Sequence, residues 1–289
     1  MSKLTVMDAL SVPGSPDRSN EDSLGWTADC AFVIDGATGI GPDFITGPTQ
    51  SDAAWLANFA KVHFEETVVP GRKIADIVRK VSELAGEIVT SAAAGAPTPA
   101  WNLPVAAFEM VRLEGDRLIA YGLGDSLLFI EDAAGRLAQH TAMPGSAAAE
   151  RDKAATLLAV DRAFALGGPG ADNDTAIADE RKRRATYNSP ESNIWTLGTC
   201  PEAADHVAVA TLSGPPARGL LCTDGFAALV TDYDRYSAGQ LIDAARRYGL
   251  AELAAELREI EQVEDPDGRR FPRMKRSDDA SAVLFEVVT

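Results

Sequence analysis

The sequence predicts an α+β fold, on three observations. Strand-like segments follow one another closely in the middle of the chain, helical segments come in pairs, and the two kinds do not alternate strictly as βαβ units would. Hydrophobic residues make up 46% and charged residues 24% of the 289 positions, an ordinary globular composition. This length can bury a substantial core without disulfides or a structural metal, and we expect one domain over residues 1–289.

The N-terminal segment is expected to form two strand regions. Residues 4–12 are strand-like, and the turn residues Pro13-Gly14-Ser15-Pro16-Asp17 follow them. A second strand region spans residues 24–35. It ends in the apolar run Cys30-Ala31-Phe32-Val33-Ile34, which is typical of a buried strand.

Two helices and a hairpin are expected next. Ser51 is the expected N-cap of a helix that runs to about residue 66, and a second helix with one apolar stripe spans about residues 74–91. Residues 105–113 and 117–122 are both strand-like. The short run Glu114-Gly115-Asp116 between them indicates a hairpin.

The second half of the chain is expected to add one more strand to the sheet. An irregular segment follows, and after it come further strands and helices. Residues 127–131 add a strand, whereas residues from about 140 to 190 are the least regular part. This part contains a helical piece near residues 149–164 and the glycine-rich run 167–170, and we interpret it as a flap or insertion over the sheet. The later elements are strands at 193–197, 206–212, 219–222 and 281–288 and helices at 238–248 and 251–263.

Charge and cysteine content exclude several classes of protein. A net charge of −16 argues against a nucleic-acid or anionic-membrane binder, because phosphates would be repelled. The three cysteines are widely spaced and form no CxxC, so neither a disulfide framework nor a zinc site is expected. The chain begins without a signal-peptide pattern, and no apolar run is long enough for a membrane span. We therefore expect a cytoplasmic protein.

Four acidic turns lie at the ends of predicted strands. They are Asn20-Glu21-Asp22, Asp35-Gly36, Asp224-Gly225 and Asp278-Asp279. A carboxylate beside a buried strand loses its hydration unless it is paired, hydrogen-bonded or bound to metal. Carboxylates that meet at one rim would form an oxygen-rich site for Mg²⁺ or Mn²⁺. Each turn taken alone is also compatible with an ordinary solvated turn or strand cap.

The order of these motifs resembles that of the metal-dependent Ser/Thr protein phosphatases of type 2C, the PPM class, in a divergent bacterial form. The resemblance covers nearly the whole chain. Five segments carry it: Arg18-Ser19-Asn20-Glu21-Asp22, Val33-Ile34-Asp35-Gly36, Gly122-Leu123-Gly124-Asp125-Ser126, Leu220-Leu221-Cys222-Thr223-Asp224-Gly225-Phe226 and Asp278-Asp279-Ala280-Ser281-Ala282-Val283.

The resemblance implies an α-β-β-α sandwich of two central antiparallel sheets flanked by helix pairs, with two Mn²⁺ or Mg²⁺ ions between the sheets. Its metal ligands would be Asp22, Asp35, Asp224 and Asp278, together with the backbone carbonyl of Gly36. As catalytic residues it implies Glu21, which would support the centre through bound water, and Arg18, which would pair with the substrate phosphate. Hydrolysis would then proceed by direct attack of a metal-bridging hydroxide, without a protein nucleophile.

Some positions depart from the family pattern. Ala37-Thr38-Gly39 stands where many members carry His-Gly-Gly, so a histidine proposed as general acid in some members is absent. Asp125 matches a residue that helps to hold a third metal in some members, but Ala228 stands where its acidic companion would be. Asp125 therefore either contributes to a third metal site or orders a tight turn. Asp279 stands where the family usually has Asn.

The leading hypothesis is a phosphatase that acts on phosphoserine or phosphothreonine in proteins; a small phosphorylated molecule is the alternative substrate. A second hypothesis is a catalytically impaired relative that binds phosphoproteins or serves in regulation. A third is a phosphatase with a covalent aspartyl-phosphate, because Asp35-Gly36-Ala37-Thr38 superficially resembles the haloacid-dehalogenase motif. That motif needs a second Asp at position 37, and no Rossmann-like alternation follows here.

Overall fold

The structure is a computed structural model that describes residues 2–46, 50–94, 96–160, 173–212 and 214–288. Within these residues the strands form two antiparallel sheets of five strands each. The first sheet has the order β1-β10-β9-β6-β7, formed by Lys3–Val12, Ala280–Val288, Ala217–Cys222, Leu127–Asp132 and Leu137–His140. The second has the order β2-β3-β4-β5-β8, formed by Asp22–Trp26, Cys30–Gly36, Ala106–Glu114, Arg117–Leu123 and Ala208–Thr211.

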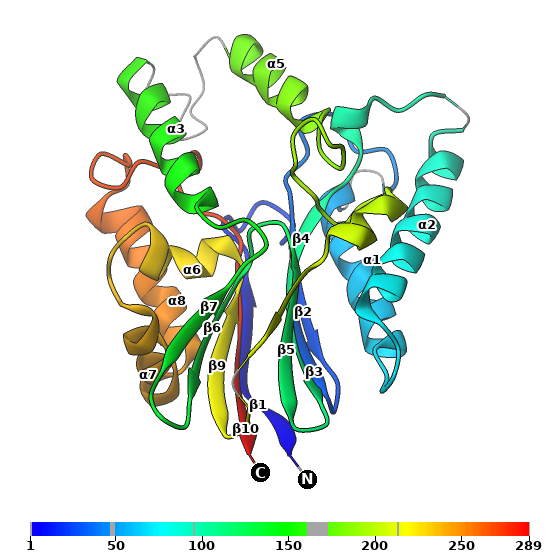
Figure 1. The fold of residues 1–289 in the computed structure, drawn as a ribbon. Helices are drawn as coiled ribbons and strands as arrows, with labels where there is room; N and C mark the ends of the chain where they lie inside the picture. Colours follow the sequence, from blue (N-terminus) through cyan, green and yellow to red (C-terminus); the bar gives the residue numbers. More distant parts are fainter. Residues whose placement is uncertain (1, 47–49, 95, 161–172, 213, 289) are drawn as a thin grey trace.

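The two sheets pack face to face, and helices cover the outer face of each (Figure 1). α1 (Asp52–Thr67) and α2 (Ile74–Ala92) lie against the second sheet. α6 (Asp224–Thr231), α7 (Ala238–Tyr248) and α8 (Leu250–Glu259) lie against the first. The expected α+β fold, an α-β-β-α sandwich, is therefore confirmed.

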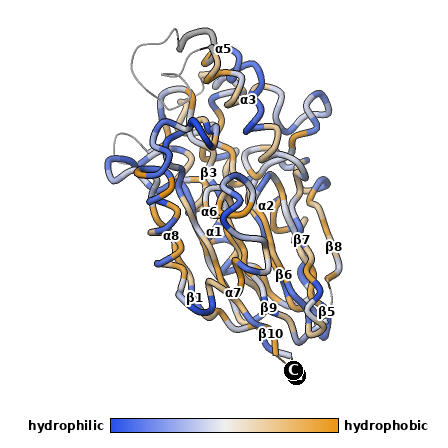
Figure 2. The backbone as a smooth tube through the Cα atoms, turned by 90° about the vertical axis from the view of Figure 1, so that its left-hand side faces the viewer, coloured by the Kyte–Doolittle hydropathy of each residue, from blue (hydrophilic) through white to orange (hydrophobic). Residues whose placement is uncertain are grey.

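Three buried apolar clusters hold the four layers together. In β4, Phe108 and Met110 belong to the cluster under α1 and α2, whereas Val111 and Leu113 belong to the cluster between the sheets. β4 is covered on both faces, and its first eight residues are buried, including the charged residues Glu109 and Arg112. Figure 2 shows hydrophobic residues along the strands and helices of the sandwich. None of the helices in the described ranges is long and apolar enough to cross a membrane.

The acidic turns gather at one end of the sandwich. β3 and β9 finish at this end, while β2, β6 and β10 start there. α3 (Ser146–Val160) and α5 (Asn173–Arg184) lie beyond the same end, whereas the start of β1 and the finish of β10 lie at the opposite one (Figure 1). α3 and α5 belong to the segment interpreted as a flap; residues 161–172, with the glycine-rich run 167–170, lie outside the described residues.

The structure differs from the sequence prediction in a few elements. The strand region expected over 24–35 is two strands, β2 and β3, joined by a turn. The strand expected at 193–197 was wrong: only Leu197 pairs, in an isolated bridge to Ala106. The strand expected over 206–212 is shorter, because residues 201–206 form a 3-10 helix. α5, α6 and β7 were not predicted from the sequence.

Candidate metal centre

Three aspartates from different parts of the chain converge at the end of the sandwich. Asp35 is near the end of β3, Asp125 lies between β5 and β6, and Asp224 is the first residue of α6. One carboxylate oxygen of each lies within 4.8 Å of the others. Among the described residues this is the only group of three or more Asp, Glu, His or Cys side chains with that geometry. Asp125, for which the sequence left two readings open, lies inside the group.

Ionisation of these three carboxyl groups is unfavourable, because they are close together and have lost much of their hydration. Loss of hydration raises the pKa of Asp35 and of Asp224 well above the usual value, and the negative charges of the neighbouring carboxylates raise both further. Burial and the charge of Asp278 also raise the pKa of Asp125. Such a group holds protons or a cation. A set of hard oxygen donors with this spacing fits Mg²⁺ or Mn²⁺.

Asp22 lies directly beside this group, but its carboxylate is hydrogen-bonded to another side chain of the protein. It faces Asp35 in the β2–β3 ladder, and its side chain is buried. Its Oδ2 accepts a hydrogen bond of 2.8 Å from the Thr223 hydroxyl, just before α6. Burial raises the pKa of Asp22 to about 8. Asp22 thus connects the second sheet to the turn that carries Asp224.

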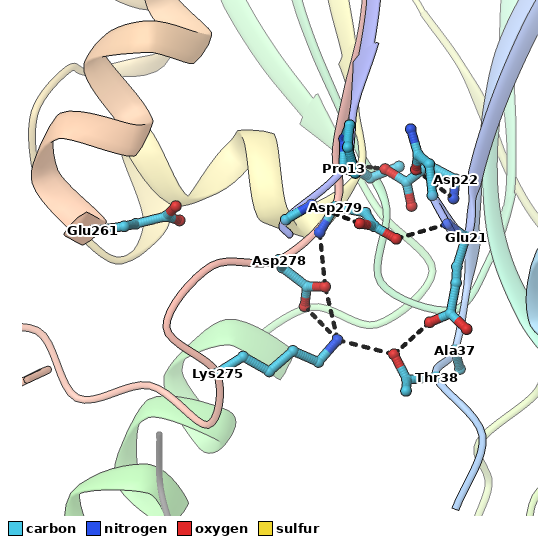
Figure 3. A network of polar contacts seen from close by, with 12 residues as sticks. Pro13, Glu21, Asp22, Ala37, Thr38, Glu261, Lys275, Asp278 and Asp279 are labelled. Atoms are coloured by element: carbon cyan, nitrogen blue, oxygen red, sulfur yellow. Dashed lines mark hydrogen bonds and ion pairs between the residues drawn. The ribbon is translucent and has the colours of Figure 1, made fainter. Parts of the chain in front are cut away.

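Asp278 forms an ion pair with Lys275, which lies outside the sequence motifs. The Lys275 ammonium lies 2.7 and 2.9 Å from the two carboxylate oxygens of Asp278 (Figure 3). Lys275 also donates to the Thr38 hydroxyl at 3.2 Å, and Thr38 donates to Glu21 Oε2 at 2.5 Å. Although burial lowers the pKa of Lys275, the charge of Asp278 and its hydrogen bond outweigh that effect and raise it.

Asp279 holds the backbone of the site together. Its Oδ1 accepts a hydrogen bond of 2.7 Å from the Gly14 N–H, and its Oδ2 accepts one of 2.6 Å from the Glu21 N–H. Figure 3 shows this contact beside the Asp278–Lys275 pair. Because both Asp279 oxygens are occupied by backbone donors, Asp278 is the residue of the two whose carboxylate faces the site.

Two glycines of the site are required by close backbone approach. A Cβ on Gly36 would lie 2.5 Å from the Glu21 carbonyl oxygen and 2.9 Å from that of Ala53. A Cβ on Gly225 would overlap the Asp279 carbonyl oxygen. Glycine at these positions therefore lets the end of β3 and the start of α6 approach the acidic turns.

Two open spaces meet at Asp278. A cavity of about 300 Å³ is lined by Asp125, Asp224 and Asp278 and, from α3, by Glu150. A groove of about 1000 Å³ is lined by Arg18, Glu21, Thr38 and Asp278. Lys275 and Asp278 line both spaces. The Arg18 side chain is exposed and makes no hydrogen bond or ion pair with any described residue.

Comparison with known proteins supports the resemblance at the level of the fold. No protein-family model matches the chain, and no curated protein matches it in sequence. Solved structures do. The Mycobacterium tuberculosis serine/threonine phosphatase PstP/Ppp is 16% identical, with 99% of this chain and 100% of that chain covered and a TM-score of 0.56.

Two further structures extend the comparison. The PstP catalytic domain in complex with two manganese ions is 18% identical, with both chains fully covered and a TM-score of 0.55. The PPM Ser-Thr phosphatase MsPP from Mycobacterium smegmatis is 16% identical, with 98% and 99% covered and a TM-score of 0.51. At these identities the similarity shows the fold, and the resemblance to PPM-type phosphatases predicted from the motifs is confirmed at that level.

Proposed function

We propose that this chain is a metal-dependent phosphatase of the PPM class that hydrolyses phosphoserine or phosphothreonine monoesters in proteins. The observation that carries the proposal is the convergence of Asp35, Asp125 and Asp224 at one end of a sandwich shared with Ser/Thr phosphatases. One of those similar structures is described as a complex with two manganese ions. The free cysteines of this chain suit a cytoplasmic setting.

Asp35, Asp125 and Asp224 would hold the metal, Mn²⁺ or Mg²⁺, with Asp22, Asp278 and the Gly36 carbonyl as the other ligands that the motifs imply. A divalent cation bound there supplies charge neutralisation for the phosphate and a lowered pKa for coordinated water. The motifs imply two such ions per chain, with Asp278 among their ligands.

The protein's own groups would bind and orient the substrate. Arg18, with an unengaged guanidinium on the groove beside Asp278, is suited to bidentate contact with a phosphate. Glu21 is buried and held by Thr38, so its carboxylate is fixed for a hydrogen bond to water at the centre. No side chain is needed as a nucleophile: Cys30 and Cys222 are buried, and His140 Nδ1 is engaged by Glu109.

A second candidate function is a phosphoprotein-binding module with little turnover. The Lys275–Asp278 ion pair favours it, because it occupies a carboxylate that the family pattern assigns to metal. The buried Ala228 also favours it, because it removes one acidic side chain from α6.

The test is hydrolysis of p-nitrophenyl phosphate and of a phosphothreonine peptide with Mn²⁺, with Mg²⁺ and with EDTA. Asp35→Asn and Asp224→Asn should each lower turnover by about 100-fold or more, since each removes a charge that binds the cation. Asp267→Asn, a change at an exposed aspartate, is the matched control and should stay within about twofold of wild type. Release of phosphate that EDTA does not affect would overturn the metal mechanism. Metal binding without any release would favour the binding module.

A further inference from the structure

The Lys275 ammonium contacts oxygen atoms from two parts of the chain. It touches both carboxylate oxygens of Asp278 and the hydroxyl of Thr38, which follows β3. Thr38 in turn donates to Glu21. A positive charge here thus links the loop before β10 to the end of β3, as Figure 3 shows.

The group of three converging aspartates does not include Asp278. Asp35, Asp125 and Asp224 bring their oxygens within 4.8 Å of one another, whereas Asp278 is paired with the ammonium. An ammonium and a divalent cation on the same carboxylate repel each other. Occupation of Asp278 by one of them therefore weakens its occupation by the other.

We infer that Lys275 is a built-in cation that competes with divalent metal for Asp278. The inference rests on the proposed function, since it takes Asp278 as a metal ligand of that centre. In the metal-free chain Lys275 stabilises the end of the sandwich by balancing carboxylate charge. A divalent ion reaches Asp278 only when the ion pair opens, so Lys275 lowers the affinity of that position.

The geometry also explains how the Lys275–Asp278 ion pair can open. Its side chain is 43% exposed, and it lies in the segment between residues 265 and 279, where no helix or strand fixes it. The groove lined by Arg18 and the cavity lined by Asp224 both reach it, so a displaced ammonium has space on either side. After displacement from Asp278, the Lys275 ammonium would still lie beside the groove.

The experiment is a calorimetric titration of the full chain with MnCl₂. The samples are wild type, Lys275→Met, Lys275→Gln and the double variant Lys275→Met/Asp278→Asn. Lys182→Met is the matched control, because Lys182 forms the same i,i+3 ion pair with Asp179 on the exposed side of α5. Both Lys275 variants should bind Mn²⁺ at least tenfold more tightly or with one more ion per chain. The control should match wild type, and the double variant should lose the gain.

Thermal unfolding supplies a second readout that does not depend on turnover. In EDTA the Lys275 variants should unfold at a lower temperature than wild type, because the carboxylates lose their counter-charge. On addition of Mn²⁺ they should gain more than wild type, since at equal ligand concentration a tighter ligand stabilises the folded state more, by RT ln(1 + [L]/Kd).

The outcomes separate this inference from the proposed function. Wild-type binding of Mn²⁺ that Asp35→Asn abolishes, with Lys275→Met and Lys275→Gln within twofold of wild type, would overturn the role of Lys275 alone. Weaker Mn²⁺ binding by the Lys275 variants would overturn it as well, because removing a competitor of the metal cannot weaken metal binding. Absence of Mn²⁺ binding in every sample would overturn both the inference and the metal-dependent function.

Discussion

The Asp279 carboxylate and the Glu21 backbone N–H are joined by a hydrogen bond of 2.6 Å, although 258 positions separate them in the chain. The second Asp279 oxygen accepts from Gly14 at 2.7 Å. One side chain just before β10 thus holds the connection between β1 and β2 near both of its ends. The positions of Glu21 and Asp22 depend on this clamp, because both follow directly from the connection that it holds.

Replacing Asp279 by Asn should lower the free energy of unfolding by about 1–3 kcal/mol, since the amide offers one acceptor oxygen and turns a donor toward the other backbone N–H. Urea unfolding in EDTA measures the change. Asp17→Asn, at an exposed aspartate in the same connection, should stay within about 0.5 kcal/mol of wild type. Equal effects of the two substitutions would show that the clamp contributes nothing.

Thr223 connects the two sheets through one hydroxyl group. Its Oγ1 donates to Asp22 Oδ2 at 2.8 Å and accepts from the Ser281 N–H at 2.9 Å. Thr223→Val keeps the shape but leaves two buried polar groups without this partner, so it should cost about 2–3 kcal/mol of stability. Thr223→Ser keeps the hydroxyl and should cost less in the same urea unfolding experiment. A valine variant as stable as the serine variant would contradict this role.

The parts of the fold that the sequence predicts best are those decided by local chemistry. Ser51 caps α1 by accepting from the Ala54 N–H, and Glu114-Gly115-Asp116 joins β4 to β5, both as expected. α6 was missed because it is a short helix of eight mostly apolar residues. In so short a segment the hydrophobic pattern of a helix cannot be told from that of a buried strand. The strand expected at 193–197 failed because strand pairing depends on distant partners, and only Leu197 finds one.

In the candidate site, too, residues marked by a local sequence pattern were predicted and a residue placed by distant contacts was not. Asp35 and Asp224 stand out in the sequence because each follows a run of strand residues and precedes a glycine. Lys275 lies in a basic, irregular stretch, and its contact with Thr38 spans 237 positions, so no local pattern indicates it. A basic residue three positions before Asp278 is the only signal that could have drawn attention to it.

Gly225→Ala should damage the site through backbone displacement. The added Cβ would overlap the Asp279 carbonyl oxygen and lie 3.2 Å from the Asp278 Cβ, so the loop before β10 must move away from α6. We expect a stability loss of about 1–3 kcal/mol, typical of overpacking, and weaker Mn²⁺ binding in calorimetry. Gly86→Ala in α2 is the control, because its Cβ meets only ordinary contacts at 3.5 Å. Mn²⁺ binding by Gly225→Ala equal to that of the control would refute this account.

A buried carboxyl group between the sheets, which is not one of the candidate metal ligands, provides a test of pH dependence. Glu109 on β4 is fully buried, and its Oε1 lies 2.5 Å from His140 Nδ1 on β7. Its Oε2 has no hydrogen-bond partner among the described residues. Burial raises the pKa of Glu109 from 4.5 to about 7, and contact with His140 limits the rise.

The sign of the pH effect follows from the direction of this shift. Between pH 4.5 and about 7 the folded chain retains a proton on Glu109 that the unfolded chain has lost, so stability falls as pH rises through this window. Glu109→Gln removes the titration and should gain up to about 3 kcal/mol relative to wild type above pH 7, and little near pH 4.5. Urea unfolding at pH 5 and pH 8 measures the difference, with the exposed Glu87→Gln as control. A difference between wild type and Glu109→Gln that is the same at both pH values would show that Glu109 does not titrate in this window.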